Sequence, residues 1–301
     1  MSSIAVRGAL APRRTWSTDL PVLLVAVVWG ASYLAAKDIT TARTVIAVLV
    51  LRFALALPVL VVTGRRALAA LTAAQWRGAG LLGLILSGIF LLETYGVVHT
   101  SATNAGLIIS LTMVFTPLAE SAVTRTRLSR AFLGAAALSV LGVVLLTQGA
   151  GFTRPSLGDL LMLLAAVART VHVLVMARVR SLRDAAALPV TTVQLGTAVL
   201  VFALLATGAE ATPWETAEAF GAREWAGLLF LSAFCTLFAF FVQMWAVRRT
   251  SPSRVSLLLG TEPLWAALAG IALGGERLGA IGLAGGALVL VGTAWGRRAA
   301  G

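Results

Sequence analysis

Long apolar runs follow one another along nearly the whole chain. Ten of them, each about 17–25 residues long, can cross the hydrocarbon core of a bilayer as helices. The runs are continuous and do not alternate with a period of two, so they predict helices rather than the strands of a membrane barrel. The predicted spans are residues 20–36, 44–63, 78–98, 104–123, 131–148, 157–177, 187–207, 226–247, 254–274 and 278–296.

The composition agrees with a membrane protein and argues against a soluble one. Hydrophobic residues make up 59% of the 301 residues and charged residues 12%, which is more apolar surface than a soluble chain of this size can bury. The net charge of +12 could suggest nucleic acid as a partner. However, most basic residues stand in pairs and triplets at the ends of the apolar runs, which is typical of loops facing an anionic leaflet. We therefore expect a lipid bilayer, and no nucleic acid, as their partner.

The basic residues fall mainly on one side of the predicted spans. With the N-terminus inside, 17 of the 24 Lys and Arg residues lie in cytoplasmic ends and loops, five lie outside, and Arg52 and Arg169 lie within spans. This bias orients membrane proteins. The apolar run that begins at Leu20 could also be a cleaved signal peptide, but it is as long as a full span and is interpreted as a retained helix. We expect an integral protein of the cytoplasmic (plasma) membrane with both termini in the cytoplasm.

The two halves of the chain correspond after a shift of 150 residues. The shift places Glu93 on Gln243 and Gly142 on Gly292. Each half holds five predicted spans, and because five is odd, the second half must be inverted relative to the first. Inverted repeats with a site between them are common in transporters that alternate access. The sequence thus predicts an all-α membrane protein of ten transmembrane helices, with a cytoplasmic tail over 1–19, a first five-helix repeat over 20–150 and a second over 151–297.

Several short motifs occur in a fixed order along residues 20–296. In chain order they are Val28-Trp29-Gly30-Ala31-Ser32, Leu51-Arg52-Phe53, Thr100 to Leu107, Thr250-Ser251-Pro252, Glu262-Pro263 and Gly275-Glu276-Arg277. Their order resembles that of EamA-type members of the drug/metabolite transporter superfamily. The resemblance implies a ten-helix inverted-repeat fold and export of small metabolites or drugs, with no particular solute indicated. The first half departs from it, because Arg125-Thr126-Arg127 stands where the family often has a second glutamate.

Two carboxylates and one amide within the spans are candidates for binding a solute, because ionisable groups at membrane depth are costly and usually functional. Glu262 directly precedes Pro263 near the middle of its span, and a proline there frees a backbone carbonyl that must face protein or water. Glu93 lies in the third span, and Gln243 takes the corresponding position in the second half. Each glutamate could bind the solute or carry a proton, or it could serve only as a structural or interfacial ion-pair partner.

Two basic side chains of the sixth span share one helix face. Arg169 and His172 are three residues apart. An arginine at mid-helix requires an anionic partner, for which Glu93, Glu262 or the carboxylate of a solute are the candidates. A single structural salt bridge between helices is the alternative. Arg52 of the second span is expected to reach a helix end by snorkelling and to serve structure rather than function.

Aromatic residues near these groups are candidates for a solute pocket. Trp29 and Tyr33 are four residues apart, and Trp265 follows Glu262 by three. A second aromatic stripe could line a pocket or simply face lipid and neighbouring helices. Its members, spaced by four, four, three and four residues, are Phe230, Phe234, Phe238, Phe241 and Trp245.

The sequence therefore predicts a secondary transporter with a central cavity and alternating access, acting on a small-molecule substrate. No nucleotide-binding motif, catalytic set or cofactor site is recognisable, and one cysteine with two histidines cannot form a typical metal site. Coupling to protons or to a solute gradient, or no coupling at all, remain open. The alternatives are an intramembrane enzyme, for which a nucleophile with its base is missing, and a non-transporting membrane scaffold subunit. A monomer or weak dimer is expected.

Overall fold

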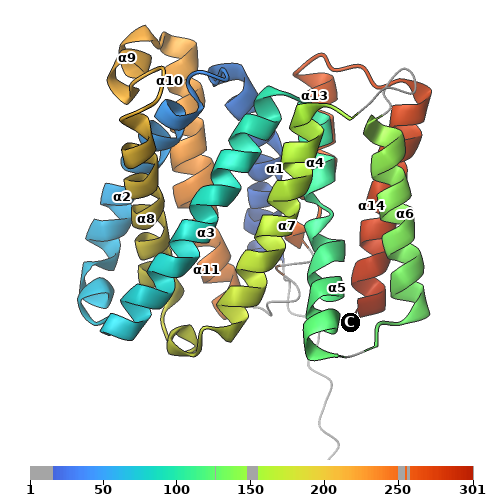
Figure 1. The fold of residues 1–301 in the computed structure, drawn as a ribbon, viewed down its shortest axis with the longest axis horizontal. Coiled ribbons are helices and arrows are strands. Elements are labelled where there is room, and N and C mark those ends of the chain that lie inside the picture. Colours follow the sequence, from blue (N-terminus) through green and yellow to red (C-terminus); the bar gives the residue numbers. More distant parts are fainter. Residues whose placement is uncertain (1–15, 126, 148–154, 250–254, 256–257, 301) are drawn as a thin grey trace, which may run out of the picture.

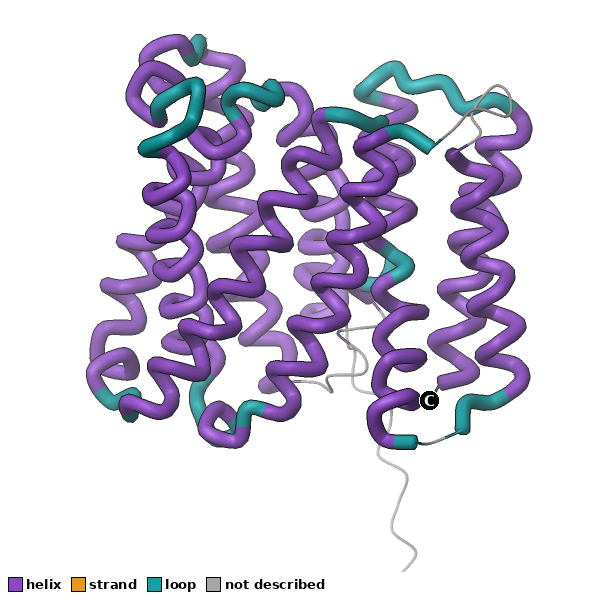
Figure 2. The backbone as a smooth tube through the Cα atoms, viewed as in Figure 1, coloured by secondary structure: helices purple, strands orange, loops and turns teal. Residues whose placement is uncertain are grey.

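The structure is a computed structural model that describes residues 16–125, 127–147, 155–249, 255 and 258–300. Throughout these ranges the chain is helical apart from short connections, and they contain no strand (Figure 2). Most of the predicted cytoplasmic tail lies outside the described residues. So do Thr126, the predicted boundary between residues 150 and 151, and the Thr250-Ser251-Pro252 motif.

Long helices run side by side through the bundle (Figure 1). Seven helical segments of the described chain are long and apolar enough to cross a membrane, and two shorter apolar helices cover Arg130–Leu146 and Ala280–Gly296. The helices are α1 (Trp16–Ile39), α2 (Val45–Ala69), α3 (Ala73–Val98), α4 (Ala102–Ile109), α5 (Thr112–Thr124), α6 (Arg130–Thr147), α7 (Leu157–Arg178), η1 (Arg180–Leu182), α8 (Ala187–Ala206), α9 (Pro213–Ala219), α10 (Ala222–Leu229), η2 (Phe230–Phe238), α11 (Ala239–Arg249), α13 (Glu262–Ala272) and α14 (Ala280–Ala300).

The predicted span 104–123 is divided into α4 and α5 by a turn at Ser110 and Leu111, which Figure 2 shows midway along the bundle. The hydroxyl of Ser110 donates to the carbonyl of Leu107 at 2.6 Å, and that of Thr112 donates to the carbonyl of Ile109 at 2.8 Å. Such local bonds compete with the regular helical pattern. The turn directs Thr112 toward the interior of the bundle.

The predicted span 226–247 is one continuous helix with an irregular centre. Its middle part, η2, is a π-helix, in which the Thr236 hydroxyl donates to the Leu231 carbonyl five residues earlier at 3.0 Å. A π-helical stretch changes the phase of the residues that follow it. Within this stretch the rings of Phe230, Phe234 and Phe238 still lie next to one another, with ring centres 5.9 and 6.3 Å apart.

The helices pack in a regular set of pairs. α6 packs along α14, α2 along α8, and α3 along both α7 and α8. α1 lies against α13 and against η2 and α11, and α13 also contacts α4. Figure 1 shows α6 and α14 together at one edge of the bundle, with the other helices grouped around α1 and α3.

Close approach of α6 and α14 depends on glycine. A Cβ atom at Gly142 would lie 2.6 Å from the backbone nitrogen of Val289 and 2.8 Å from the carbonyl oxygen of Gly285. Backbone atoms cannot move aside as a flexible side chain can, so the two helices would have to separate. Small residues at such crossings are typical of membrane bundles.

We expect Gly142→Ala to destabilise the protein by about 1–3 kcal/mol, the usual cost of overpacking a tight contact. Gly88→Ala is the matched control, because no atom lies within 4 Å of a Cβ built on this helical glycine. Thermal unfolding in detergent can be followed by the reaction of a thiol dye with Cys235, which is buried in the folded protein and is the chain's single cysteine. Equal midpoints for the two variants would contradict the prediction.

Candidate functional site

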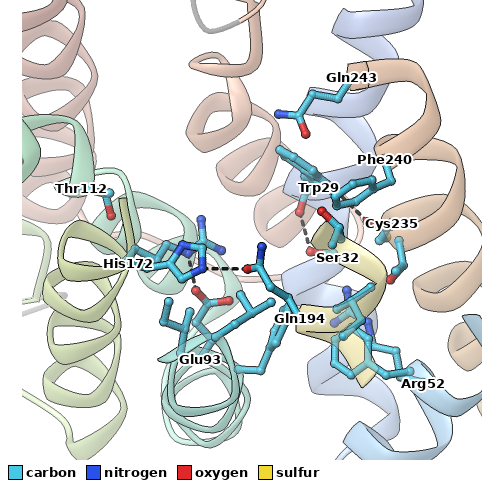
Figure 3. A pocket seen from close by; sticks show the side chains of 18 of the residues that line it. Trp29, Ser32, Arg52, Glu93, Thr112, His172, Gln194, Cys235, Phe240 and Gln243 are labelled. Atoms are coloured by element: carbon cyan, nitrogen blue, oxygen red, sulfur yellow. Dashed lines mark hydrogen bonds and ion pairs between the residues drawn. The ribbon is translucent and has the colours of Figure 1, made fainter. Parts of the chain in front are cut away.

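A cavity of about 510 Å³ lies in the interior of the bundle, with polar and apolar walls (Figure 3). Its lining comes from α1, α2, α3, α5, α7, α8, η2, α11 and α13. Ligand sites in proteins commonly occupy about 300–1,000 Å³. Its size therefore suits a small organic molecule.

Seven of the eight candidate binding residues lie on this cavity. The exception, Trp265, packs against Gly30, and its indole nitrogen donates to the Thr261 hydroxyl at 3.2 Å. Binding of a solute by the seven stays a prediction. They are Trp29, Tyr33, Glu93, Arg169, His172, Gln243 and Glu262.

An ion pair joins α3 to α7 at the cavity wall. Arg169 Nε donates to Glu93 Oε1. The Glu93 side chain is 11% exposed and that of Arg169 is 34% exposed. Of the partners considered for Arg169, the structure thus selects Glu93. The pair neutralises both charges, and removing either partner would leave the other uncompensated inside the bundle.

A second carboxylate is held at a helix start. Glu262 is the first residue of α13, and the chain turns at Gly260 and Thr261 immediately before it. The hydroxyl of Tyr33 on α1 donates to Glu262 Oε1 at 2.8 Å. A carboxylate is favoured in the first turn of a helix, where unpaired N–H groups carry partial positive charge. The irregularity expected before Pro263 thus begins three residues earlier, at Gly260, and Glu262 lines the cavity.

Neutral polar groups complete the wall. His172 Nε2 lies 2.9 Å from Gln194 Oε1, and Figure 3 shows this contact next to Glu93. The indole nitrogen of Trp29 donates to the Cys235 carbonyl at 2.9 Å, which ties α1 to η2. The sequence-based prediction did not include Gln194, although an amide within the apolar span 187–207 could have indicated a cavity residue.

Arg52 occupies the cavity wall rather than a helix end. Its guanidinium carbon lies 5.0 Å from the ring centre of Phe53 and 5.7 Å from that of Phe90. All three residues line the cavity. Arg52 therefore does not snorkel as expected, because two aromatic rings hold its charged group inside the bundle.

The aromatic stripe of the eighth predicted span lies away from the cavity. Phe230 and Phe234 stack on each other, and Phe234 is 51% exposed. Phe240, outside the stripe, lines the cavity instead. None of the five stripe residues is among those that line the cavity, which favours the alternative of lipid contact or helix packing.

Glu276 closes one end of the bundle by binding the start of α4. The backbone N–H groups of Ala102 and Thr103 donate to its two carboxylate oxygens at 2.6 and 3.0 Å. Lys37 Nζ lies 3.9 Å from Glu276 Oε1 and donates to the Thr100 carbonyl at 2.5 Å. We call Glu276, Lys37 and the segment Thr100–Thr103 the clasp.

Asp159 strengthens the same end. It caps the start of α7 by accepting from the Ser156 backbone N–H at 2.9 Å. Its other oxygen accepts from the Thr100 hydroxyl at 2.5 Å and from the Asn104 amide at 3.2 Å. Two carboxylates from the second half of the chain thus hold the α3–α4 junction of the first half.

Replacing Glu276 is expected to loosen the clasp. Glu276→Ala leaves two backbone N–H groups without their acceptor, so the start of α4 should open more often. In a Cys235→Ala background, a cysteine placed at the buried Thr103 should react several-fold faster with a thiol reagent. Glu218→Ala, on the exposed face of α9, is the control. An unchanged reaction rate in the Glu276 variant would show that the carboxylate does not hold this junction.

No group of three or more His, Cys, Asp or Glu residues within the described chain could hold a metal ion. His172 contacts an amide, not a nucleophile. The described arrangement offers binding and orientation of a solute through charges, hydrogen bonds and aromatic surface.

Comparison with known proteins identifies relatives over most of the chain. The EamA-like transporter family matches residues 16–148 and 156–295. An uncharacterized transporter of Archaeoglobus fulgidus is 26% identical over 263 residues, which cover 83% of this chain and 87% of the relative. A protein of known crystal structure is similar over 93% of this chain and 96% of its own, with a TM-score of 0.62 and 19% identity. At that identity the similarity concerns the fold alone.

Proposed function

We propose that this membrane transporter, which belongs to the EamA-like transporter family, moves small metabolites or drugs through its central cavity by alternating access. Export from the cytoplasm is the proposed direction. The observation that carries the proposal is the cavity itself, in which charged and polar side chains face each other inside a bundle of apolar helices. Groups of this kind are costly in a membrane and are kept where a polar solute passes.

We further propose ten transmembrane helices in two inverted repeats, over residues 20–150 and 151–297. The helix break at residues 110–111 recurs at residues 260–261, a shift of 150. Each break is followed by a cavity residue, Thr112 in the first half and Glu262 in the second, and Glu93 and Gln243 obey the same shift. The separate family matches to the two halves also support this division.

The packing of the helices supports the same symmetry. When each helix is replaced by its counterpart in the other half, the α1–α13 contact corresponds to the contact of α7 with α4 and α5. In the same way, the α3–α7 contact corresponds to that of α1 with η2 and α11. The α2–α8 pair and the α6–α14 pair each join two counterparts, so this exchange leaves both contacts unchanged. Two structurally equivalent halves could rock about these shared contacts and expose the cavity to each side in turn.

The basic residues support an orientation with the clasp outside. Four arginines lie at the end of the bundle opposite the clasp (Figure 1). They are Arg65 near the end of α2, Arg125 directly after α5, Arg178 at the end of α7 and Arg183 in the loop before α8. Under the positive-inside bias this end is cytoplasmic. In this orientation both termini are cytoplasmic, and the clasp closes the outer side of the bundle. The cavity extends along α7 to Met176, toward the cytoplasm.

The test is solute flux in vesicles that contain the purified protein. A panel of amino acids, nucleosides, hydrophobic carboxylates and toxic analogues is loaded inside, and efflux is followed with and without a proton gradient. We expect efflux of at least one class, absent from protein-free vesicles. A folded protein that moves no member of the panel under either condition would overturn the proposal and favour a non-transporting role. The family match speaks for a transporter rather than an enzyme.

A further inference from the structure

Arg52 is the charged residue of the cavity wall that lacks a polar partner. Its Nε atom is buried and makes no hydrogen bond within the described part of the chain, and no ion pair of Arg52 is present there either. A guanidinium stays protonated in proteins, so this charge cannot be lost by giving up a proton. A buried ion normally has an opposite charge beside it.

The other charged side chains of the wall have hydrogen-bond partners. Arg169 and Glu93 form an ion pair, and Glu262 accepts the hydroxyl hydrogen of Tyr33. In the view of Figure 3, Arg52 and Glu93 lie on opposite sides of Gln194. Within the described chain no carboxylate forms an ion pair with Arg52, so this group can pair with a negative charge from outside the chain.

Two aromatic rings flank the guanidinium of Arg52 at the cavity. Phe53 and Phe90 lie at stacking distance from the guanidinium, with the charged carbon 5.0 and 5.7 Å from the ring centres. Aromatic contacts use the faces of the planar group, whereas its N–H donors point outward in its plane. Such a fork matches the two oxygens of a carboxylate.

Apolar side chains form another part of the cavity wall. Leu86 and Ile89 of α3 and Leu195 of α8 line the cavity together with the two phenylalanines. A solute that places an anionic group on Arg52 would bury its hydrocarbon part against these side chains. Burial of this kind contributes about 25 cal/mol per Å² of apolar surface.

We propose that Arg52 binds the carboxylate of a small hydrophobic organic monoanion, and so determines the substrate class of the cavity. This inference rests on the proposed function, because it takes the cavity to be the solute site. A single negative charge is favoured over a doubly charged phosphate, since the same wall carries the carboxylate of Glu262, which forms no ion pair within the described chain. The anionic group of a lipid shares this chemistry and must be distinguished by the experiment.

The test uses three probes of one shape: 3-phenylpropanoate, its neutral amide and 3-phenylpropylamine. Binding to the purified protein in uncharged detergent is measured by isothermal titration calorimetry. We expect the carboxylate to bind on the order of tenfold tighter than the amide, as one charge-assisted contact provides. Arg52→Gln should remove this preference, and Arg52→Lys should restore part of it. Arg178→Gln, an exposed arginine at the end of α7, is the matched control and should keep it.

Equal binding of the carboxylate and the amide, or an unchanged preference in folded Arg52→Gln, would overturn the inference. So would tighter binding of phenyl phosphate than of 3-phenylpropanoate, or binding confined to preparations that retain anionic lipid. Efflux of the same probes from phosphatidylcholine vesicles separates this result from the proposed function. Arg52-dependent binding without flux would leave the anion site standing and refute transport of these probes. Flux of the amide or amine at the rate of the carboxylate would support transport and refute the anion site.

Discussion

Glu262→Gln is expected to lower the transport rate about tenfold or more while the protein keeps its fold, since a hydrogen bond to a charged group contributes about 1.5–3 kcal/mol. Glutamine has the size of glutamate, and its carbonyl oxygen can still accept the Tyr33 hydroxyl, which lies 2.8 Å from Glu262 in the present structure. The substitution removes the negative charge and the ability to take up a proton. Contacts between α1 and α13 should therefore survive while the chemistry of the cavity changes.

Flux from reconstituted vesicles measures this effect, with the most strongly transported solute of the panel as cargo. Glu218→Gln is the control, because this exposed glutamate lies on α9, away from the cavity. The thermal midpoint of each variant checks the fold. Unchanged transport by Glu262→Gln would remove this carboxylate from the mechanism, whereas loss of the folded protein would assign it a structural role.

Arg169→Leu is expected to destabilise the protein by about 3 kcal/mol, near the lower end of what breaking a buried ion pair costs. The substitution leaves the Glu93 carboxylate without its cation in a wall where its side chain is 11% exposed. The estimate is taken near the lower end because the Arg169 side chain is 34% exposed. Because Arg169 also lines the cavity, transport should be lost together with stability.

The double variant Glu93→Leu/Arg169→Leu separates the two effects. Replacing both partners with apolar residues removes the unpaired charge, so most of the lost stability should return. Transport should not return, since neither charge is present. Thermal unfolding followed by labelling of Cys235 measures the first outcome, and vesicle flux measures the second. A single variant as stable as the unmodified protein, or a double variant no more stable than Arg169→Leu, would contradict this role of the ion pair.

The positions of most helices could be predicted because membrane crossing is a local property of a segment. A run of about 20 apolar residues must satisfy its own backbone hydrogen bonds, and a helix does this within the segment. The turn between α4 and α5 was not predicted, since it depends on the side-chain bonds of Ser110 and Thr112. The π-helix η2 was not predicted either, because the composition of residues 230–238 suits an α-helix as well as a π-helix.

The charged part of the cavity could also be anticipated. Glu93, Arg169 and Glu262 stand out because an ionisable residue in an apolar span must face protein or water. The structure places all three on one cavity, although 76 residues separate Glu93 from Arg169, and 229 residues separate Glu262 from its partner Tyr33. Which cation meets which carboxylate was not predictable, since this depends on how α3 and α7 pack together.

The sequence by itself determined that this chain is a helical membrane protein of a transporter family. It also identified the charged residues within the spans, which are costly in a membrane unless they serve a function. The membrane-spanning helices follow from hydrophobicity and length, which each segment carries alone, whereas the family resemblance rests on the order of the short motifs. Only the tertiary structure decided that Arg52 lies against two rings at the cavity, that Trp265 is not among the residues lining it, and that Glu276 holds the start of α4. Each of these depends on atoms brought together from distant parts of the chain, where direction and distance, rather than residue type, determine the contact.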